Sequence, residues 1–185
     1  MSHTNITLQT IEKAHIFYLN KSLHQYIDKV TSYILTGINK LEHVFLIEND
    51  RIFSLIMKNL PNSIMPEEMK RIHHINNYDY YFSSGSFNPP YIFEYLNNEL
   101  DYYMQNKLPF RIWAHVEWAA DEGVKEILVE FEREADEIVQ NNQILLICAY
   151  EEDRLSLSLK EPLMSCHEYI MTDDDLVLST NYRKK

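Results

Sequence analysis

Glycine is scarce in this chain. Only three glycines occur among its 185 residues, at Gly37, Gly85 and Gly123. A phosphate-binding P-loop, G-x-x-x-x-G-K-S/T, needs glycines so that successive backbone N–H groups can wrap around the phosphates. The stretch YLNKS (18–22) links a predicted strand to a predicted helix as such a loop does, but it contains Lys21 and Ser22 without any glycine. We therefore expect no nucleotide there, and interpret Ser22 as a helix N-cap and Lys21 as an ordinary loop cation.

The chain also has few basic residues, few cysteines and no long apolar run. Lys and Arg number 17 against 28 Asp and Glu, a formal net charge of −11, which argues against nucleic acid as a partner because DNA-binding proteins cluster Lys and Arg. The two cysteines, Cys148 and Cys166, form no metal spacing and no disulfide framework, and we expect Cys148 to be a reduced core thiol. No apolar run approaches the length of a membrane span, and the N-terminal residues lack the regions of a signal peptide. We expect a cytoplasmic protein with no membrane partner.

Short apolar stretches alternate with amphipathic ones along the chain. Strands are predicted over 15–19, 43–47, 72–77, 110–118, 143–150, 167–171 and 175–180. Helices are predicted over 23–38, 51–60, 66–72, 89–105 and 124–140, with a loop over 78–88. This alternation predicts an α/β fold, with a mainly parallel central sheet and helices on both faces. We expect one domain over 12–180, an N-terminal extension over 1–11 and a basic tail over 181–185.

Polar side chains are expected to gather at the carboxyl ends of the strands, where open α/β sheets bind ligands. Those ends hold residues 18–22, 48–50, 117–118 and 150–153. Glu117 follows a strand where an NTPase would carry a metal-binding or catalytic acid. Without phosphates, it can bind a polar ligand or a facing histidine, or it can be a structural carboxylate at a helix N-terminus. Aromatic residues near these ends are candidate walls of an apolar pocket: Tyr78, Tyr80, Tyr81, Phe82 and Phe87.

The eight histidines form no H-x-x-x-H or H-E-x-x-H pair. His73 and His74 are neighbours in a predicted strand and would point to opposite faces of the sheet. A metal could be held only by residues brought together from distant parts of the chain. We therefore expect no metal, no cofactor and no catalytic residue.

Several motifs occur in an order typical of one family. The opening HIFYLNKSLHQYIDKVTSYILTGINKLEHVFLIEND has a His-led strand, a long helix and a strand with an acidic end. It is followed by YYFSSGSFNPPYIFEYLNNEL, RIWAHVEWA, ILVEFEREADEIV, LLICAYEEDRLS and LMSCHEYIM. Together these segments, over about 12–178, resemble the MEDS domain, the sensory domain named for methanogens, methylotrophs and the DcmR regulator. The resemblance implies a three-layer RecA/KaiC-like fold that has lost its nucleotide motif.

The resemblance also implies which positions matter. The recurrent positions of the family correspond to His15, Glu117, Trp118, Glu130, Cys148, Tyr150 and His167. Combined with the strand ends, they yield the predicted ligand-binding residues His15, Tyr18, Asn20, Glu48, Glu117, Trp118, Tyr150 and His167. The chain departs from the family pattern at Glu168, where Pro is common, and at Glu151, where the family has Asp.

The favoured function is a stand-alone sensory or regulatory module. It would bind a small organic ligand, a signalling partner, or both, without hydrolysing NTP. A separate kinase or transcription-regulatory protein is the expected partner, and a homodimer is compatible with the sequence. One alternative is a pure interaction protein that uses the acidic helix 124–140, with Glu130, Glu132 and Glu134 on its surface. The other is a residual ATPase or hydrolase that depends on Lys21 or Glu117.

Overall fold

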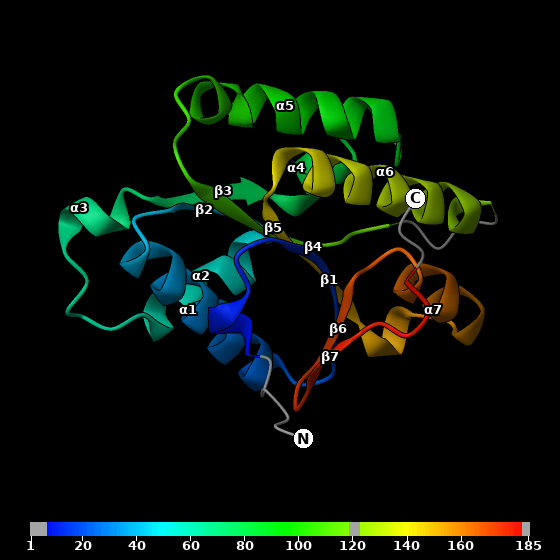
Figure 1. Cartoon of the computed structure of the whole chain (residues 1–185), viewed down its shortest axis with the longest axis horizontal. Helices are drawn as coiled ribbons and strands as arrows, with labels where there is room; N and C mark the ends of the chain where they lie inside the picture. Colours follow the sequence, from blue (N-terminus) through cyan, green and yellow to red (C-terminus); the bar gives the residue numbers. More distant parts are fainter. Residues whose placement is uncertain (1–6, 119–122, 183–185) are drawn as a thin grey trace.

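A seven-stranded sheet forms the centre of the molecule (Figure 1). The computed structural model describes residues 7–118 and 123–182. The strands are β1 (Ala14–Asn20), β2 (His43–Glu48), β3 (Ile72–Asn76), β4 (Phe110–His115), β5 (Leu145–Glu151), β6 (Tyr169–Thr172) and β7 (Leu176–Leu178). Their order in the sheet is β3-β2-β4-β5-β1-β6-β7, and every pairing is parallel except that of β6 with β7. The predicted α/β fold with a mainly parallel sheet is confirmed.

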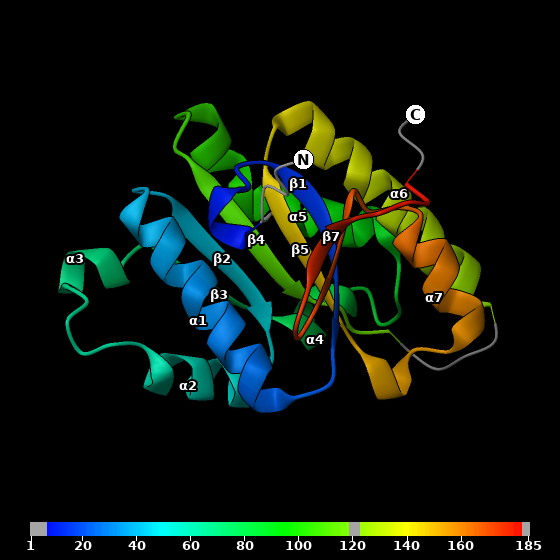
Figure 2. The same cartoon turned by 60° about the horizontal axis from the view of Figure 1, so that its bottom comes forward.

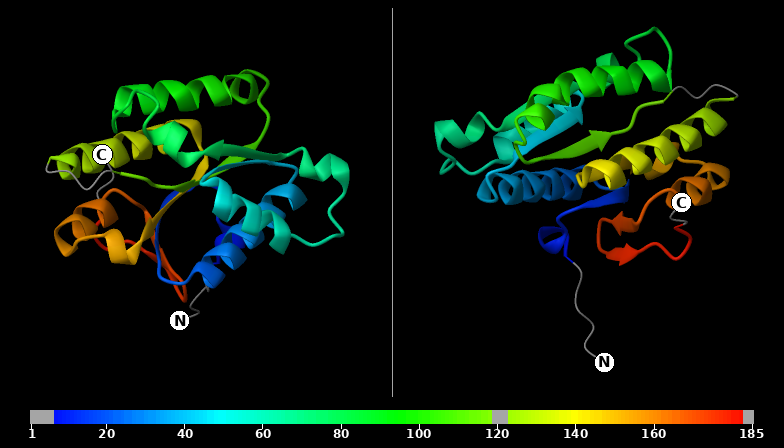
Figure 3. Two further views of the ribbon diagram at one scale, coloured as in Figure 1. Left: turned by 180° about the vertical axis from the view of Figure 1, so that it is seen from behind. Right: turned by 45° about the horizontal axis from the view of Figure 1, so that its top comes forward.

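Helices cover both faces of this sheet, as predicted (Figure 1). One face, called the α1 face below, carries α1 (Leu23–Asn39) and α2 (Asp50–Asn59), which lie beside each other in Figure 2. The other, the α6 face, carries α4 (Asn77–Tyr81), α5 (Pro89–Gln105), α6 (Val124–Asn142) and α7 (Leu157–Met164) (Figure 3). The shorter elements are α3 (Pro66–Met69) and the 3₁₀ turns η1 (Leu8–Thr10) and η2 (Glu152–Arg154). Among the helices of the described residues, none has the length and apolar character to cross a membrane.

The alternation of side chains along the central strands divides the core into two halves. In β1, Ile16 and Tyr18 pack on the α1 face, whereas Phe17 and Leu19 pack on the α6 face. The same alternation runs through β5, which lies between β4 and β1 and is covered by helices on both sides. Such a strand reads as a continuous apolar run because both of its faces are buried.

Three local predictions differ from the structure. The strand expected over 110–118 ends at His115, because the chain leaves the sheet after one further backbone bond, from the Val116 N–H to the Ala149 carbonyl at 3.0 Å. The loop expected over 78–88 contains part of helix α4, whose N-cap Asn76 accepts backbone N–H bonds at its side chain. Helix α7 lies in a stretch for which no element was predicted.

Gly37 allows α1 to approach the sheet closely. A Cβ at this position would lie 2.6 Å from Cγ2 of Val44 and 3.0 Å from Cδ of Arg111. Arg111 is 1% exposed, pairs with Glu42 and stacks its guanidinium 4.8 Å from the ring centroid of Tyr33. The absence of a side chain at Gly37 therefore makes room for a buried cation between helix and sheet.

The connections that follow β1 and its neighbour β5 run in opposite directions across the sheet. Helix α1 leads from β1 to β2 over one face, whereas α7 leads from β5 to β6 over the other. Neighbouring carboxyl ends with connections on opposite faces leave a crevice between them, the usual ligand position in open α/β sheets. In this chain the crevice lies beside Asn20 and Glu151, which pair in register at the ends of β1 and β5.

Candidate functional site

A carboxylate of this chain occupies the start of α1, where a P-loop would hold phosphate. Asp173, in the turn between β6 and β7, accepts hydrogen bonds at Oδ2 from the backbone N–H groups of Lys21 (3.2 Å) and Ser22 (3.0 Å). Its Oδ1 accepts a hydrogen bond from the Tyr18 hydroxyl at 2.7 Å. Ser22 is the N-cap of α1, as predicted, with its hydroxyl oxygen 3.4 Å from the Gln25 backbone N. Backbone donors at a helix N-terminus attract anions, and here Asp173 supplies the anion.

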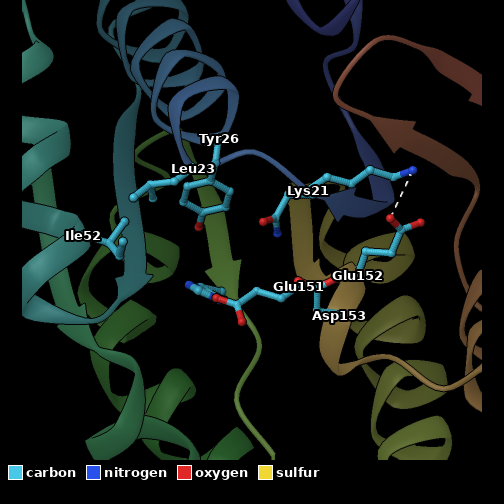
Figure 4. A pocket seen from close by; sticks show the side chains of 9 residues that line it. Lys21, Leu23, Tyr26, Ile52, Glu151, Glu152 and Asp153 are labelled. Atoms are coloured by element: carbon cyan, nitrogen blue, oxygen red, sulfur yellow. Dashed lines mark ion pairs between the residues drawn. The ribbon is translucent and has the colours of Figure 1, made fainter.

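A pocket of about 150 Å³ opens at the carboxyl ends of the central strands. It is lined by Asn20, Lys21, Leu23, Tyr26, Ile52, His115, Glu151, Glu152 and Asp153. Figure 4 shows Leu23 and Ile52 on one side of this pocket, Glu151 below Tyr26, and Lys21 paired with Glu152 at 3.0 Å. Because one water molecule needs only about 10–15 Å³ of such space, the pocket has room for several waters or a small organic molecule.

Glu48 organises the side chains behind the pocket. It is fully buried at the end of β2. Its Oε2 accepts a hydrogen bond from the Tyr26 hydroxyl at 2.5 Å, and the Tyr26 oxygen accepts one from Nε1 of Trp113 at 2.8 Å. Its Oε1 accepts the Asn49 backbone N–H at 2.8 Å and lies 2.8 Å from Nδ1 of His115. These donors offset the cost of burying a carboxylate, and they hold Tyr26 and His115 in place.

His115 lies between two carboxylates at the pocket. Burial lowers the pKa of His115, but the neighbouring Glu151 and Glu48 outweigh it and raise that pKa to about 10. His115 in turn holds the pKa of Glu151 below its usual value. The Nε2 atom of His115 lies 3.5 Å from Oε1 of Glu151 and makes no hydrogen bond, although it is buried. His115 and Glu151 thus form an ion pair at the pocket, and Nε2 of His115 has no hydrogen bond to add to it.

The eight predicted ligand-binding residues lie in three places. Asn20 lines the pocket and donates from Nδ2 to the Tyr150 carbonyl at 2.9 Å, whereas Tyr18 and Glu48 lie behind the lining residue Tyr26. Glu117 and Trp118 lie beyond the end of β4. The remaining three are buried on the α6 face: His15, Tyr150 and His167. Since side chains alternate along β1, His15 and Tyr18 face opposite sides of the sheet.

The match to a known family covers most of this architecture. A family model described as the methanogen/methylotroph, DcmR sensory domain (MEDS) matches residues 14–168. The chain belongs to the MEDS family. The matched segment begins with β1 and ends just before β6, so every residue that lines the pocket falls inside it. No match is found among the curated proteins. Membership in the MEDS family gives this chain a sensory role.

In this MEDS domain, Glu117 and Trp118 contact a cation rather than the pocket. Nη1 of Arg154 donates to Oε1 of Glu117 at 2.6 Å, and Nη2 donates to the Trp118 carbonyl at 3.1 Å. The guanidinium carbon also lies 4.6 Å from the Trp118 ring centroid. Both side chains therefore tie the end of β4 to the segment after β5.

Of the nine residues that line the MEDS pocket only Asn20 is a predicted site residue, and two of those missed, Tyr26 and His115, contact Glu48. Each carries a signal that the sequence contains. His115 lies two residues after Trp113 in a strand, so the two side chains share one face of the sheet. A titratable side chain next to a buried apolar run is a signal for a site on that face. Tyr26 belongs to the apolar stripe of α1 but has a hydroxyl that needs a partner when buried.

The acidic helix of this MEDS domain does not present all of its carboxylates to solvent. Glu130 and Glu134 are exposed, but Glu132 is fully buried, so its assignment to an interaction surface is wrong. Its position explains the burial, because it lies on the apolar stripe with Leu128 and Ala135. A carboxylate on that stripe is a sequence signal for an internal partner.

The aromatic cluster after β3 packs mainly into the MEDS core. Tyr80 and Tyr81 are buried and, with Phe93 and Phe131 among other residues, line a small apolar space of about 20 Å³. Tyr78 is 67% exposed. A space of this size holds at most about one water molecule, so the cluster acts in packing. The neighbouring His73 and His74 point to opposite faces, as predicted: His73 stacks on Phe45, and His74 on Phe53.

Proposed function

We propose that the chain senses a small neutral organic molecule that carries a hydroxyl or amide group and binds in the 150 Å³ pocket. The ion pair of His115 with Glu151, in which Nε2 of His115 makes no hydrogen bond, is the observation that supports this proposal. A hydroxyl or amide can accept a hydrogen bond from His115 and donate one to Glu151. The carbon atoms of such a ligand would pack on Leu23, Ile52 and the Tyr26 ring.

The charge around the pocket favours this class of ligand. Glu151, Glu152 and Asp153 line one side, and Lys21 already pairs with Glu152. A ligand with its own carboxylate or phosphate would meet these acids at short range, where like charges repel. The structure-based expectation is therefore binding of alcohols or amides, with anionic analogues rejected.

A thermal-shift panel tests the proposal. Short alcohols and amides, with the matching carboxylic acids, are added to the full chain at neutral pH. We expect a higher melting temperature with one of the neutral classes and an unchanged melting temperature with the acids. His115→Gln and Glu151→Gln should each abolish the shift. Glu117→Gln is the matched control, because Glu117 lies outside the pocket and should leave the shift intact. No shift with either neutral class, or a shift that survives both pocket variants, contradicts the proposal.

The output is proposed to pass to a separate kinase or transcription-regulatory partner, or to a homodimer. The sensory character of the MEDS family supports this part of the proposal. Light scattering and partner capture with and without the active ligand test it. A ligand that changes neither the molar mass nor the captured partner argues against it.

The alternative of a residual ATPase has less support. The backbone donors of Lys21 and Ser22 already bind Asp173. Calorimetry with ATP and Mg²⁺ should therefore show no binding heat. Heat that disappears in Lys21→Ala would favour the ATPase instead.

A further inference from the structure

Four side chains of types that can ligate a metal converge on the α6 face of the sheet, away from the pocket. They are His15 from β1, Glu132 from α6, Cys148 from β5 and His167 from the connection between α7 and β6. Each is at most 2% exposed. Their ligand atoms all lie within 4.8 Å of one another. Residues so far apart in the chain share no spacing motif, so only folding brings them together.

Neighbouring groups orient three of these side chains toward one point. Nδ1 of His167 lies 2.7 Å from the Leu163 carbonyl, and Nδ1 of His15 lies 3.2 Å from the Cys166 carbonyl. A ring N–H that donates to each carbonyl leaves Nε2 free to face the centre of the cluster. Oε1 of Glu132 accepts a hydrogen bond from the Tyr150 hydroxyl, which leaves Oε2 facing the same centre.

Three of the distances between the converging atoms are close to those around one ion. Nε2 of His15 lies 3.4 Å from Sγ of Cys148 and 3.2 Å from Oε2 of Glu132. Oε2 of Glu132 lies 3.3 Å from Nε2 of His167. A tetrahedral zinc ion with bonds of about 2.0–2.3 Å holds neighbouring ligand atoms roughly 3.3–3.8 Å apart.

Two of these atoms lack any hydrogen bond within the described structure, Oε2 of Glu132 and Nε2 of His167. Both residues are completely buried. Buried polar atoms are normally paired, because leaving one unpaired costs about 1–3 kcal/mol. A metal ion at the centre would satisfy both.

We propose that His15, Glu132, Cys148 and His167 form a site for a divalent transition-metal ion, with zinc as the best fit. Two imidazoles, a thiolate and a carboxylate are ligands that zinc accepts in tetrahedral geometry, whereas magnesium and calcium prefer oxygen ligands. Four protein ligands without an exposed position are typical of a structural or regulatory site rather than a catalytic one. The proposal replaces the expectation of no metal, and it is independent of the pocket on the opposite face.

An open surface hollow leads to the outer side of this cluster. It is lined by Asp136 and Cys166, among other residues. Oδ1 of Asp136 lies 3.4 Å from Nδ1 of His15, and the Asp136 side chain is 14% exposed. Asp136 thus links the buried imidazole to this hollow.

Cobalt substitution tests the site with a direct spectroscopic readout. The full chain is purified under reducing conditions, treated with a chelator, and titrated with Co²⁺ or Zn²⁺ alone. We expect one ion per chain, a thiolate-to-cobalt charge-transfer band in the near ultraviolet, and strong visible bands of tetrahedral cobalt. Zinc should displace cobalt and remove both the charge-transfer band and the visible bands. A wild-type cobalt complex without the charge-transfer band overturns the proposal.

Matched variants assign the ligands. Cys148→Ser should remove the charge-transfer band, whereas Cys166→Ser should keep it, because the Cys166 side chain is buried but outside the set of four. His167→Asn and Glu132→Gln should each weaken Zn²⁺ binding at least about tenfold. Circular dichroism checks that each variant is folded. If one variant does not fold, the wild-type cobalt spectrum still tests whether a thiolate binds the ion. Equal affinity in all of these variants would contradict the site.

Discussion

Asp173 accepts a hydrogen bond from the backbone N–H of Ser22 at 3.0 Å, at the first turn of α1. It therefore provides from within the chain the negative charge that a helix N-terminus favours. The same carboxylate receives the Tyr18 hydroxyl, so it fastens the β6–β7 turn to the end of β1. The layout that resembles a P-loop is thus a site of internal bonding.

Replacement of Asp173 by Ala should destabilise the fold. It removes the acceptor for two backbone N–H groups and the Tyr18 hydroxyl. We expect the free energy of unfolding to fall by about 1–3 kcal/mol in urea titrations. Asp174→Ala is the control, since this exposed neighbour should change stability by less than about 0.5 kcal/mol. Equal stability of the two variants would show that the hydrogen bonds to Asp173 do not contribute to the free energy of unfolding.

A methyl group at Gly37 should also destabilise the fold. In Gly37→Ala the new Cβ would meet Val44 and Arg111 at distances that force the helix or the buried side chain to move. Overpacking of this kind costs about 1–3 kcal/mol, more than the gain in helix propensity of about 1 kcal/mol. Thermal unfolding measures the loss. Asn39→Ala, at an exposed position in the same turn, should be close to neutral, and a neutral Gly37→Ala would contradict the close approach.

The stability contributed by His115 should decline in alkaline solution. The pKa of His115 is about 10 in the folded protein, above its ordinary value of 6.5. The charged imidazole therefore stabilises the fold fully below about pH 6.5, and this contribution is lost as the pH rises toward 10.

The comparison of wild type with His115→Gln isolates this effect. The difference in unfolding free energy between them should shrink from pH 6 to pH 10, with a slope near 1.4 kcal/mol per pH unit for one proton. Urea titrations at several pH values measure it. A difference that is constant or grows with pH would show that Glu48 and Glu151 do not hold a proton on this ring.

The three carboxylates of α6 should respond differently to charge reversal. Glu130→Lys and Glu134→Lys are expected to change stability by less than about 0.5 kcal/mol, because both side chains are exposed. Glu132→Lys should cost at least about 3–5 kcal/mol, since it places a cation beside His15 in the core. Chemical unfolding of the three variants provides the comparison. Similar losses for all three would be inconsistent with the burial of Glu132.

Much of the fold can be read from the chain itself. Apolar runs of strand length alternating with amphipathic stretches locate the seven strands and most helices, because periodicity reports burial directly. The absence of glycine near Lys21 rules out the phosphate cradle, and Ser22 is identified as a cap from residue type alone. The order of motifs identifies the MEDS family without any coordinates.

The candidate sites depend on contacts that no local pattern encodes. Strand order places the end of β2 beside that of β4, and so brings Glu48 to His115. The separation of His15 from Tyr18, by contrast, follows from the alternation of side chains along β1. A sequence that alternates its side chains specifies two faces, but it does not say which distant residues will meet on each.

The sequence alone therefore determined the class of fold, the family and the loss of the nucleotide motif, because these follow from residue type and periodicity along the chain. Tertiary structure alone decided that Asp173 fills the anion position, that His115 meets Glu151 at a pocket, and that four potential metal ligands meet around one point. The physical reason is that each depends on distances between residues remote in sequence, which only the packing of helices on the sheet sets.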